Sequence, residues 1–504
     1  MSWTWCFRSS SSEVILDRVI SQGRRVVCQL NARHFFAANC PLRRAHAPQY
    51  NSIPAKAASS DGAVGAQPSV IQILRERGLV QDTANEGLEA TAAETSLALY
   101  CGFDPTADSL HLGHLLSILV LKWFQRSGHK PIALLGGATG RVGDPSGRSL
   151  ERPVLSVEEI ESNVRAIQGT LQSLLRDTGS EGNGKAQHPA TVLNNLEWFG
   201  GMGMLAFLRD IGKFARVNVM LSRESVKQRL SRDEGISFTE FTYQLLQGFD
   251  FVHLCRHHGV RLQIGGSDQM GNILTGLELA RKLGDEGGQQ PLPPCYGLVF
   301  PLLTTSDGTK MGKSASGAIW LSPDKLSPFK FYQYLVTSVP DADVIRFLKM
   351  LTFLPLGDIE ALQASMGTPD YSPNTAQRLL ASEVTRFVHG EEGLQQALNA
   401  TQALAPGGST QLDAAALEAI AQDAPTAKLS RQEVVGKPLA DVMVAAGLQP
   451  SKAASRRMIK GGGVRINNEK VSDEAQTLEG DDLIDDRMLL LAAGKKNKML
   501  VHVT

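Results

Sequence analysis

An apolar run, a helix-period stretch and a second apolar run follow one another between residues 97 and 135. Leu97–Cys101 is apolar at every position, which is typical of a strand that is covered on both faces of a sheet. Apolar residues then recur at helical spacing from Leu112 to Trp123, and Ile132–Leu135 forms the second run. Strand, helix and strand in this order predict a parallel βαβ unit, in which ligands bind at the carboxyl ends of the strands.

Polar side chains occur where the same domain is expected to bind ligands. A third strand, Arg261–Ile264, is followed by Asp268, which can either accept hydrogen bonds from ribose hydroxyls or cap the next helix. The helix-period stretch before this strand places Tyr243, Gln247 and Asp250 on one face, among aromatic residues. A polar face inside an apolar stretch predicts the wall of a pocket.

Two short motifs combine imidazole and ammonium groups. His-Leu-Gly-His at residues 111–114 begins a predicted helix, for which Asp108 or Ser109 is the expected N-cap. Free backbone N–H groups and the helix dipole favour phosphate at such a position. Lys-Met-Gly-Lys-Ser at residues 310–314 adds two ammonium groups on a segment that can close over the same phosphates. Together the two motifs predict nucleotide chemistry.

The first 60 residues differ in composition from the rest of the chain. They contain eight Lys or Arg residues and only two acidic residues, with a run of serines at positions 9–12. This profile is typical of an organelle transit peptide, and a basic arm that touches RNA is the alternative. The remaining chain has 43 basic and 49 acidic residues. Any contact of that remainder with nucleic acid must therefore come from local basic patches.

Composition also argues against a membrane-spanning protein, a disulfide framework and a metal site. The chain is 42% hydrophobic and 20% charged, and no apolar run approaches the roughly 20 residues that cross a bilayer, so a soluble protein is expected. Beyond residue 60, Cys101, Cys255 and Cys295 show no C-x-x-C spacing. Neither a disulfide framework nor a metal site is expected. A length of 504 residues predicts two to four domains.

Four segments carry a family resemblance, and they occur in family order: Tyr100–His114, Gly143–Gly147, Gln263–Gln269 and Lys310–Ser314. They resemble the motifs of bacterial-type tyrosyl-tRNA synthetases, which are class I aminoacyl-tRNA synthetases. The resemblance extends from about Leu74 to the C-terminus.

Two residues depart from the family pattern. Met270 stands where the family usually has Trp, which suggests a repacked wall. Gly312 stands where the family usually has Ser, which predicts a more mobile loop.

The resemblance implies a reaction. L-tyrosine would be activated with ATP, which is a substrate accompanied by Mg²⁺, and then transferred to the 3′ end of tRNA-Tyr, with no tightly bound cofactor. Tyr100 and Asp250 would bind the substrate phenol, because a pocket with two buried polar groups rejects phenylalanine. The other tyrosine-binding residues would be Asp144, Tyr243 and Gln247 at the ammonium and Gln269 near the carboxylate.

The resemblance also implies which residues bind ATP. Those around the adenosine would be Cys101, Gly102, Asp104, His114, Gly266 and Asp268. Those at the departing pyrophosphate would be Thr106, His111, Arg148, Arg152, Lys310 and Lys313. The catalytic residues would be Thr106, His111, His114, Lys310 and Lys313, which act by positioning and charge stabilisation.

The C-terminal segment predicts a basic helix over residues 451–460 and then a hairpin, because Asn467 and Asn468 tolerate a left-handed turn. It resembles an S4-type RNA-binding domain, and a merely solvated charged face is the alternative. The residues expected to contact RNA are Lys452, Arg456, Arg457, Lys460 and Arg465.

Pattern and resemblance together predict an α/β chain of several domains. The expected parts are a transit peptide at 1–60, a Rossmann-like parallel-sheet catalytic domain at 66–326 with the lysine loop at 310–314, an all-α anticodon-binding domain at 327–400, a linker rich in Ala, Gly, Pro and Asp at 401–436, and a small α+β S4-like domain at 437–504.

The resemblance further implies a homodimer, with tRNA-Tyr, L-tyrosine and ATP as partners. The composition of residues 1–60 predicts the mitochondrial matrix, the chloroplast stroma or both, and no membrane partner is expected. Two other functions stay open. A tryptophanyl-tRNA synthetase shares the fold and both motifs, although Tyr100 with Asp250 suits a phenol. An RNA-binding or intron-splicing factor derived from a synthetase would be free to lose any of four residues that this chain keeps: His111, His114, Lys310 and Lys313.

Overall fold

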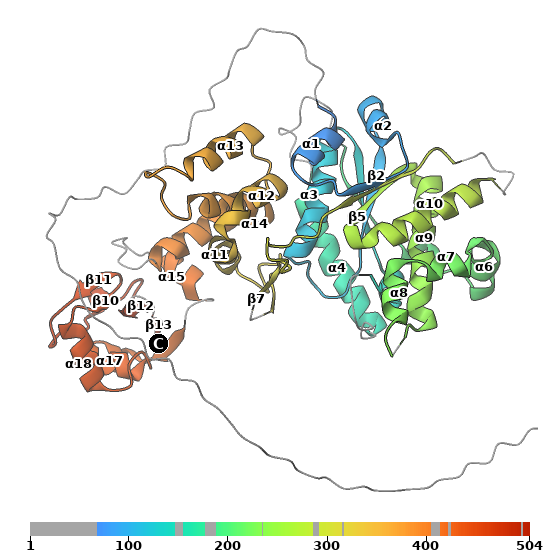
Figure 1. The fold of residues 1–504 in the computed structure, drawn as a ribbon. Helices are drawn as coiled ribbons and strands as arrows, with labels where there is room; N and C mark the ends of the chain where they lie inside the picture. Colours follow the sequence, from blue (N-terminus) through green and yellow to red (C-terminus); the bar gives the residue numbers. More distant parts are fainter. Residues whose placement is uncertain are drawn as a thin grey trace, which may run out of the picture. The chain divides into compact units, whose positions relative to one another are not determined.

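Figure 1 shows the fold of the chain in a computed structural model. Residues 1–60, Arg148, Arg152 and the side chain of Lys313 lie outside the described part, so the structure does not test the expectations for them. The described residues are 68–146, 155–176, 188–233, 235–285, 292–314, 317–404, 414–421, 425–494 and 497–504.

A six-stranded sheet forms the centre of the N-terminal domain. Its strand order is β1-β6-β5-β2-β3-β4, and neighbouring strands are parallel except for β1 and β6. The three strands expected from the sequence are β2, β3 and β5, and the predicted parallel βαβ unit is confirmed. The strands are β1 (Asp82–Ala84), β2 (Ala98–Phe103), β3 (Lys130–Leu135), β4 (Thr191–Asn194), β5 (Val260–Gly266) and β6 (Tyr296–Phe300).

Helices cover both faces of this sheet (Figure 1). The burial of β2 on both sides explains why its sequence is apolar. Leu99, Cys101 and Phe103 belong to a core cluster with the leucines of α3, whereas Tyr100 belongs to a second cluster with Phe251 of α9. Successive side chains of a strand point to opposite faces, so a strand that is buried on both faces must be apolar throughout. The covering helices are α3 (Leu112–Arg126), α4 (Val157–Leu174), α9 (Phe238–His258) and α10 (Met270–Asp285).

The direction in which strands are added reverses between β2 and β5. The chain proceeds from β2 to β3 and β4 on one side, and then crosses to β5 and β6 on the other. Connections that leave such a switch point in opposite directions open a crevice at the carboxyl ends of the strands. The ligand site is therefore expected between the ends of β2 and β5.

The segment from residue 328 to residue 403 is helical, as predicted from its sequence pattern. Leu335 of α11 and Phe347 of α12 share one hydrophobic cluster with Leu119 of α3, so these helices pack directly on the catalytic domain. Non-helical angles at Gly390 (φ 73°, ψ −178°) interrupt the long last helix. The helices are α11 (Pro328–Ser338), α12 (Asp341–Leu351), α13 (Leu356–Ser365) and α14 (Thr375–Ala403).

The C-terminal domain contains a second sheet, with the order β11-β10-β12-β13-β9. The predicted hairpin is β10–β11, and Asn467 and Asn468 form its turn at φ 47° and 70°, which confirms the prediction. One face of the sheet packs on α17 and α18. The elements are β9 (Thr426–Leu429), α17 (Leu439–Ala445), α18 (Lys452–Lys460), β10 (Val464–Ile466), β11 (Glu469–Val471), β12 (Met488–Ala493) and β13 (Asn497–Val503).

The prediction of a linker over residues 401–436 was wrong for the described part of that segment. β9 pairs with β13 as a parallel edge strand, and α15 (Ala414–Ala421) contributes Leu417 to a cluster with Leu490 and Leu500 of the sheet. Alanine is common in linkers, but it is also the best helix former and packs closely on a sheet. The C-terminal domain therefore begins before residue 437.

The shorter elements connect these larger ones. No described helix is both long enough and apolar enough to cross a bilayer. The remaining elements are α1 (Val70–Glu76), α2 (Leu88–Glu94), η1 (Thr139–Arg141), α5 (Leu196–Phe199), α6 (Met204–Asp210), η2 (Gly212–Phe214), α7 (Val217–Leu221), α8 (Glu224–Leu230), η3 (Ser267–Gln269), β7 (Lys313–Ser314), β8 (Gly317–Ala318), α16 (Arg431–Val434) and η4 (Gly480–Asp482).

Candidate active site

A cavity of about 360 Å³ opens at the carboxyl ends of β2 and β5, where the sheet topology predicts a ligand site. Every described residue that the sequence analysis assigned to tyrosine or ATP lines this one cavity. These residues are Tyr100, Cys101, Gly102, Asp104, Thr106, His111, His114, Asp144, Tyr243, Gln247, Asp250, Gly266, Asp268, Gln269 and Lys310.

Asp250 lies on α9 at one end of the cavity, and two residues that follow β4 hold its carboxylate. Asn195 donates to Oδ2 at 3.1 Å, and the indole N–H of Trp198 donates to Oδ1 at 2.9 Å. Burial raises the pKa of Asp250 well above its usual range, although these two hydrogen bonds act in the opposite direction. Asp250 is thus a fixed and poorly solvated acceptor, whose remaining lone pairs are available to a polar ligand atom.

Trp198 is supported in turn by an imidazole. Its ring stacks on that of His253, with the centroids 4.2 Å apart and the planes inclined by 16°. Burial, and then the neighbouring His257 and His258, lower the pKa of His253 to about 4. The His253 ring is therefore neutral at physiological pH, and it stacks without placing a charge beside Asp250.

Tyr100 extends from β2 into the same end of the cavity. Its side chain is buried, and its hydroxyl has no hydrogen-bond partner among the described residues. Burial, and then the charge of Asp250, raise the pKa of Tyr100 well above its usual value. A buried hydroxyl without a partner is costly, so a ligand atom that hydrogen-bonds to it would be favoured at this end of the cavity.

Four side chains beside this pair form a continuous amide–carboxylate network. Gln269 donates to Asp144 Oδ2 at 2.9 Å, and Gln247 donates to Gln269 at 3.2 Å. Asn272 donates to the side-chain oxygen of Gln247 at 2.9 Å. The network presents acceptor oxygens to the cavity, an arrangement that suits an ammonium group.

Two hydroxyl groups from different elements hold the Asp104 carboxylate in the cavity. The Tyr243 hydroxyl donates to its Oδ2 and the Thr139 hydroxyl donates to its Oδ1, both at 2.8 Å. Gly136 is required here, because a Cβ at that position would lie 2.1 Å from Asp104 Oδ1. Asp104 was expected beside the adenosine, and its carboxylate also contacts Tyr243, which was expected at the substrate ammonium.

The two histidines of the first motif cap their own helix. His111 Nδ1 accepts from the Gly113 N–H at 3.1 Å, and His114 Nδ1 accepts from the His111 N–H at 3.2 Å. The prediction that Asp108 or Ser109 is the N-cap was wrong, because imidazole was not considered as a cap. A neutral imidazole that accepts at Nδ1 carries its proton on Nε2. Both rings are therefore set to present an N–H donor.

The lysine loop meets this helix through Ile319. The Ile319 N–H donates to the Gly312 carbonyl at 2.9 Å, and the Leu112 N–H donates to the Ile319 carbonyl at 2.8 Å. Gly312 adopts φ 101°, and a Cβ there would lie 3.4 Å from the Gly113 nitrogen. The glycine at this position is thus explained by a left-handed backbone beside the helix start, which a serine would strain.

Charged groups of opposite sign line the nucleotide end. Burial and then Asp144 raise the pKa of Asp268, while the charge of Lys310 lowers it. Asp268 lies in the turn η3 after β5, just before α10, and it lines the cavity. Burial raises the pKa of Cys101 to about 12, so this thiol is not a nucleophile at neutral pH.

Met270 packs against the apolar cluster that contains Tyr100, at the beginning of α10. Its side chain is partly buried and is not among the residues that line the cavity, and the repacking of a pocket wall stays a prediction.

The basic residues of the C-terminal domain form two groups instead of one. Val464 and Ile466 of β10 face α18, so Arg465 between them lies on the opposite face of the sheet. Burial, and then the charge of Arg465, lower the pKa of Lys498. Arg456 and Arg457 are exposed on α18 and form no ion pair within the described part of the chain. Lys452 is paired with Asp441 at 2.9 Å and Lys460 with Glu474 at 3.5 Å.

Sequence reasoning missed several residues that line the cavity or hold its lining residues in place. Asn195 and Trp198 follow β4, a four-residue strand that is only partly buried and therefore gave no clear apolar run. The available signal was position, because these residues follow a parallel strand at the edge where the other site residues lie. Thr139 and Asn272 were missed because a hydroxyl and an amide carry no charge pattern of their own.

Comparison with known proteins agrees with this geometry. Residues 92–405 match the family tRNA synthetases class I (W and Y), and residues 416–501 match the family Tyrosine–tRNA ligase SYY-like C-terminal domain. The second match supports a C-terminal domain that begins before residue 437.

Similar proteins carry the same names. The chain is 52% identical over 441 residues to the chloroplastic/mitochondrial tyrosine–tRNA ligase of Arabidopsis thaliana, covering 87% of this chain and 84% of that protein. It is 48% identical to the tyrosine–tRNA ligase of Protochlamydia amoebophila, covering 86% and 99%. A C-terminally truncated mitochondrial tyrosyl-tRNA synthetase of Aspergillus nidulans is 36% identical, with a TM-score of 0.59, covering 66% of this chain and 93% of that one. The chain therefore belongs to the tyrosine–tRNA ligases within the class I tRNA synthetases.

Proposed function

We propose that this chain activates L-tyrosine with ATP and transfers it to tRNA-Tyr, and that the substrate phenol binds between Tyr100 and Asp250. The observation that carries the proposal is the buried Tyr100 hydroxyl, which has no partner among the described residues and lies within the electrostatic influence of Asp250. A phenol can donate to one of these groups and accept from the other, whereas an indole or a phenyl ring cannot.

The remaining residues have roles that follow from their chemistry. Asp144, Tyr243 and Gln247 hold the substrate ammonium, and Gln269, which is hydrogen-bonded to Asp144 and Gln247, lies near the tyrosine carboxylate. This arrangement directs the carboxylate toward the nucleotide end. A carboxylate oxygen then attacks the α-phosphorus of ATP, and pyrophosphate leaves. In the second step a terminal ribose hydroxyl of tRNA attacks the tyrosyl carbonyl, and AMP leaves. Neither step needs a nucleophile from the protein.

The phosphate end supplies charge stabilisation. The Nε2–H groups of His111 and His114 and the ammonium of Lys310 act on the phosphates, and by resemblance Thr106, Arg148, Arg152 and Lys313 act with them. Mg²⁺ prefers several oxygen ligands, and no group of three or more His, Cys, Asp or Glu side chains among the described residues could hold a metal ion. We therefore assign the ion to the ATP phosphates, with which it enters.

The comparisons favour tyrosine over tryptophan as the substrate. The family of residues 92–405 includes both specificities, but the family of residues 416–501 is described for tyrosine–tRNA ligases. The intron-splicing alternative has no observation of its own in the structure.

ATP–pyrophosphate exchange tests this function directly. Purified protein would be assayed with tyrosine, tryptophan and phenylalanine as separate substrates. Exchange with tyrosine alone is expected. Exchange with tryptophan would overturn the assignment of the phenol pair, and an absence of exchange with all three would favour a protein that only binds RNA, which intron RNA and tRNA binding would then test.

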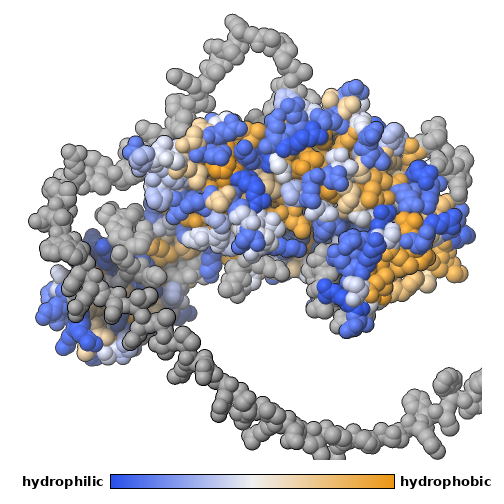
Figure 2. Space-filling view, viewed as in Figure 1, coloured by the Kyte–Doolittle hydropathy of each residue, from blue (hydrophilic) through white to orange (hydrophobic). Residues whose placement is uncertain are grey.

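An exposed apolar surface supports the proposed homodimer. Figure 2 shows hydrophobic residues gathered on the right of the view, where α6, α7 and α8 lie in Figure 1. Leu205 is 83% exposed, and patches of this kind mark protein interfaces. The exposed apolar residues of this region are Met204, Leu205, Leu208, Val217, Leu221, Leu230, Phe238 and Leu274.

Light scattering tests the dimer. Leu205→Glu should shift the protein toward a monomer, since it places a charge in the interface. Val157→Glu is the matched control, because Val157 is an exposed apolar residue on α4, outside this surface. Equal effects of both changes would argue against the assigned interface.

The proposed RNA surface is the exposed face of α18. Arg456→Gln together with Arg457→Gln should weaken binding of tRNA-Tyr and reduce its salt dependence. Tyrosine activation should be unchanged, because the cavity does not include this helix.

The proposed location is the mitochondrion or the chloroplast. It rests on the composition of residues 1–60 and on the name of the Arabidopsis thaliana relative. Fusion of residues 1–60 to a fluorescent protein would test it, and a fluorescent signal confined to the cytosol would count against it.

A further inference from the structure

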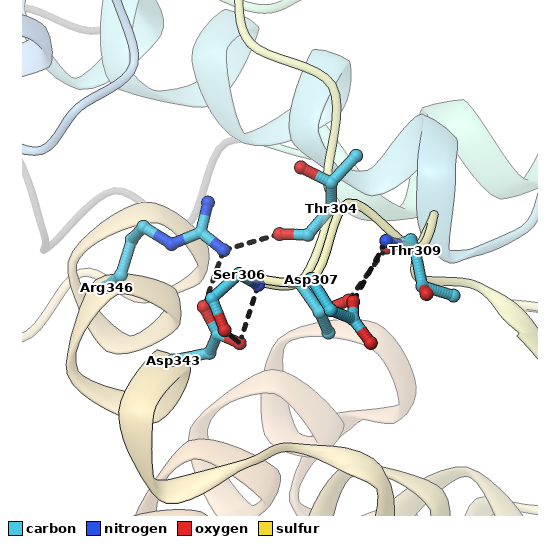
Figure 3. A network of polar contacts seen from close by, with 7 residues as sticks. Thr304, Ser306, Asp307, Thr309, Asp343 and Arg346 are labelled. Carbon is cyan, nitrogen blue, oxygen red and sulfur yellow. Dashed lines mark hydrogen bonds and ion pairs between the residues drawn. The ribbon is translucent and has the colours of Figure 1, made fainter.

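The base of the lysine loop is attached to helix α12 of the α-helical domain. Figure 3 shows Asp343 and Arg346 of α12 directed toward the segment that precedes Lys310. The Asp343 carboxylate accepts from the Ser306 backbone N–H at 2.9 Å and from the Ser306 hydroxyl at 3.1 Å. Arg346 donates to Asp343 at 2.8 Å and also to the carbonyl oxygen of Thr304.

Asp343 is a buried anion whose hydrogen bonds are satisfied. Its side chain is only 2% exposed. Burial alone would raise the pKa of Asp343, but the hydrogen bonds from Ser306 and Arg346 lower it below the ordinary value. The carboxylate is therefore ionised at neutral pH. Loss of one partner leaves a buried charge uncompensated, which makes this attachment sensitive to substitution.

A tight turn carries the attachment to Lys310. The Thr305 N–H donates to the Thr309 carbonyl at 2.8 Å, and the Thr309 N–H donates to Asp307 at 3.0 Å. Thr304 and Lys310 then pair across the turn in an isolated antiparallel bridge. The backbone of Lys310 is thus fixed against the residue that Arg346 holds.

A second helix of the same domain holds the other side of Lys310. The Tyr334 hydroxyl, on α11, accepts from the Gly312 backbone N–H at 3.2 Å. The lysine loop is therefore attached to the α-helical domain both before and after Lys310. None of the described residues of that domain lines the cavity.

We propose that Asp343 and Arg346 are positioning residues, which fix the base of the lysine loop on α12. They thereby hold Lys310 where it can stabilise the ATP phosphates while the tyrosine carboxylate attacks. The inference rests on the proposed function, in which Lys310 acts on the phosphates. It makes the α-helical domain part of the activation step, in addition to any contact with tRNA. Tyrosine binding should not depend on the pair, because Asp250 and Tyr100 are held by other elements.

Single-turnover formation of tyrosyl-adenylate by the full chain tests the proposal. Asp343→Asn should slow this step about tenfold to a hundredfold, since small misplacements of a reacting group have effects of that size. The dissociation constant of tyrosine should stay within about twofold, because the tyrosine end does not move. Arg346→Lys keeps the charge but loses the paired N–H geometry, so it should fall between the wild type and Asp343→Asn.

Asp341→Asn is the matched control. Asp341 lies on the same helix, but its partner is Gln377 of α14, which donates to it at 2.6 Å. This change weakens a contact of α12 without touching the lysine loop. It should leave adenylate formation unchanged, even if it lowers the melting temperature.

Limited trypsin digestion gives a readout that a purely structural role would not move. Cleavage after Lys310 should be faster in Asp343→Asn than in Asp341→Asn. Should Asp343→Asn fail to fold, Ser306→Ala removes one hydrogen bond from the exposed loop side and should show the same two effects at smaller size.

Two results would overturn the proposal. One is an Asp343→Asn protein with a lower melting temperature but an unchanged rate of adenylate formation. The other is an equal loss of rate and of tyrosine affinity. If the wild-type chain forms no tyrosyl-adenylate, the proposed function fails, and trypsin cleavage still tests the attachment by itself.

Discussion

At the tyrosine end of the cavity, the polar groups stand on long, buried elements: Asp250 is 2% exposed on a helix of 21 residues, and Tyr100 is 1% exposed on a central strand. At the phosphate end, Lys310 stands on an exposed segment of turns, and Gly312 adopts a left-handed backbone. The first end can be rigid, because it only has to recognise one side chain. The second end depends on a loop whose backbone is held by α12 before Lys310 and by α11 after it, so contacts outside the cavity set its geometry.

Asp250→Asn should break the tyrosine end and have the largest effect. The new amide N–H₂ faces either the Asn195 amide or the Trp198 indole, so donor meets donor in a buried site. We expect about a thousandfold loss of kcat/KM for tyrosine. Pyrophosphate exchange measures it, and the KM of ATP should change little.

The control for this change is Asp341→Asn, which should leave exchange intact. A rise in the KM of ATP as large as the rise in the KM of tyrosine would show that the two ends of the cavity are not separate.

Lys310→Ala should break the phosphate end. We expect about a hundredfold decrease in the rate of adenylate formation, because one preorganised cation is lost where charge develops. Fluorescence titration should give an unchanged dissociation constant for tyrosine. Lys349→Ala, on α12 and away from the cavity, is the control, and a matching fall in tyrosine affinity would contradict the assigned role.

Tyr100→Phe should sharpen the comparison, because function and stability are expected to change in opposite directions. Loss of the hydroxyl should lower kcat/KM for tyrosine about tenfold and reduce discrimination against phenylalanine. The free protein should become more stable by about 1 kcal/mol, since a buried hydroxyl without a partner is removed. Urea unfolding without ligand measures the second effect, and lower stability there would be evidence that the hydroxyl is paired.

Gly312→Ser should have the smallest effect on the reaction. The left-handed backbone at this residue costs a side chain about 1–2 kcal/mol, which the loop can relieve by shifting. We expect about a threefold slower adenylate formation and no change in tyrosine affinity. Gly447→Ser, at φ 74° in the C-terminal domain, is the matched control for backbone strain alone. A faster reaction would support the earlier expectation that serine steadies the loop.

Those parts of the molecule in which one strong pattern dominates were predictable from the sequence. The apolar runs of β2, β3 and β5 gave the parallel sheet, and the polar face of α9 gave the pocket wall. The histidine and lysine motifs were recognised by residue type and order. In the cavity they lie around one space, as the topology of the sheet requires.

The parts that were missed depend on partners that no local pattern reveals. Asn195 and Trp198 gain their role only when β4 brings them beside Asp250. The edge strand β9 was mistaken for linker, because its four residues form no apolar run and its pairing with β13 is remote in sequence. His111 was not recognised as a helix cap, because caps are expected among Ser, Thr, Asp and Asn.

The capping role of His111 and His114 bears on how an inactive reference protein should be made. Replacing either imidazole with alanine would remove a hydrogen bond that starts α3 as well as a donor to phosphate, and α3 runs through the core of the catalytic domain. Any loss of activity would then have two causes, a weakened start of α3 and a missing hydrogen-bond donor. A folded but inactive protein, suitable for trapping substrates or for separating RNA binding from catalysis, is better obtained at Lys310, with both histidines left in place.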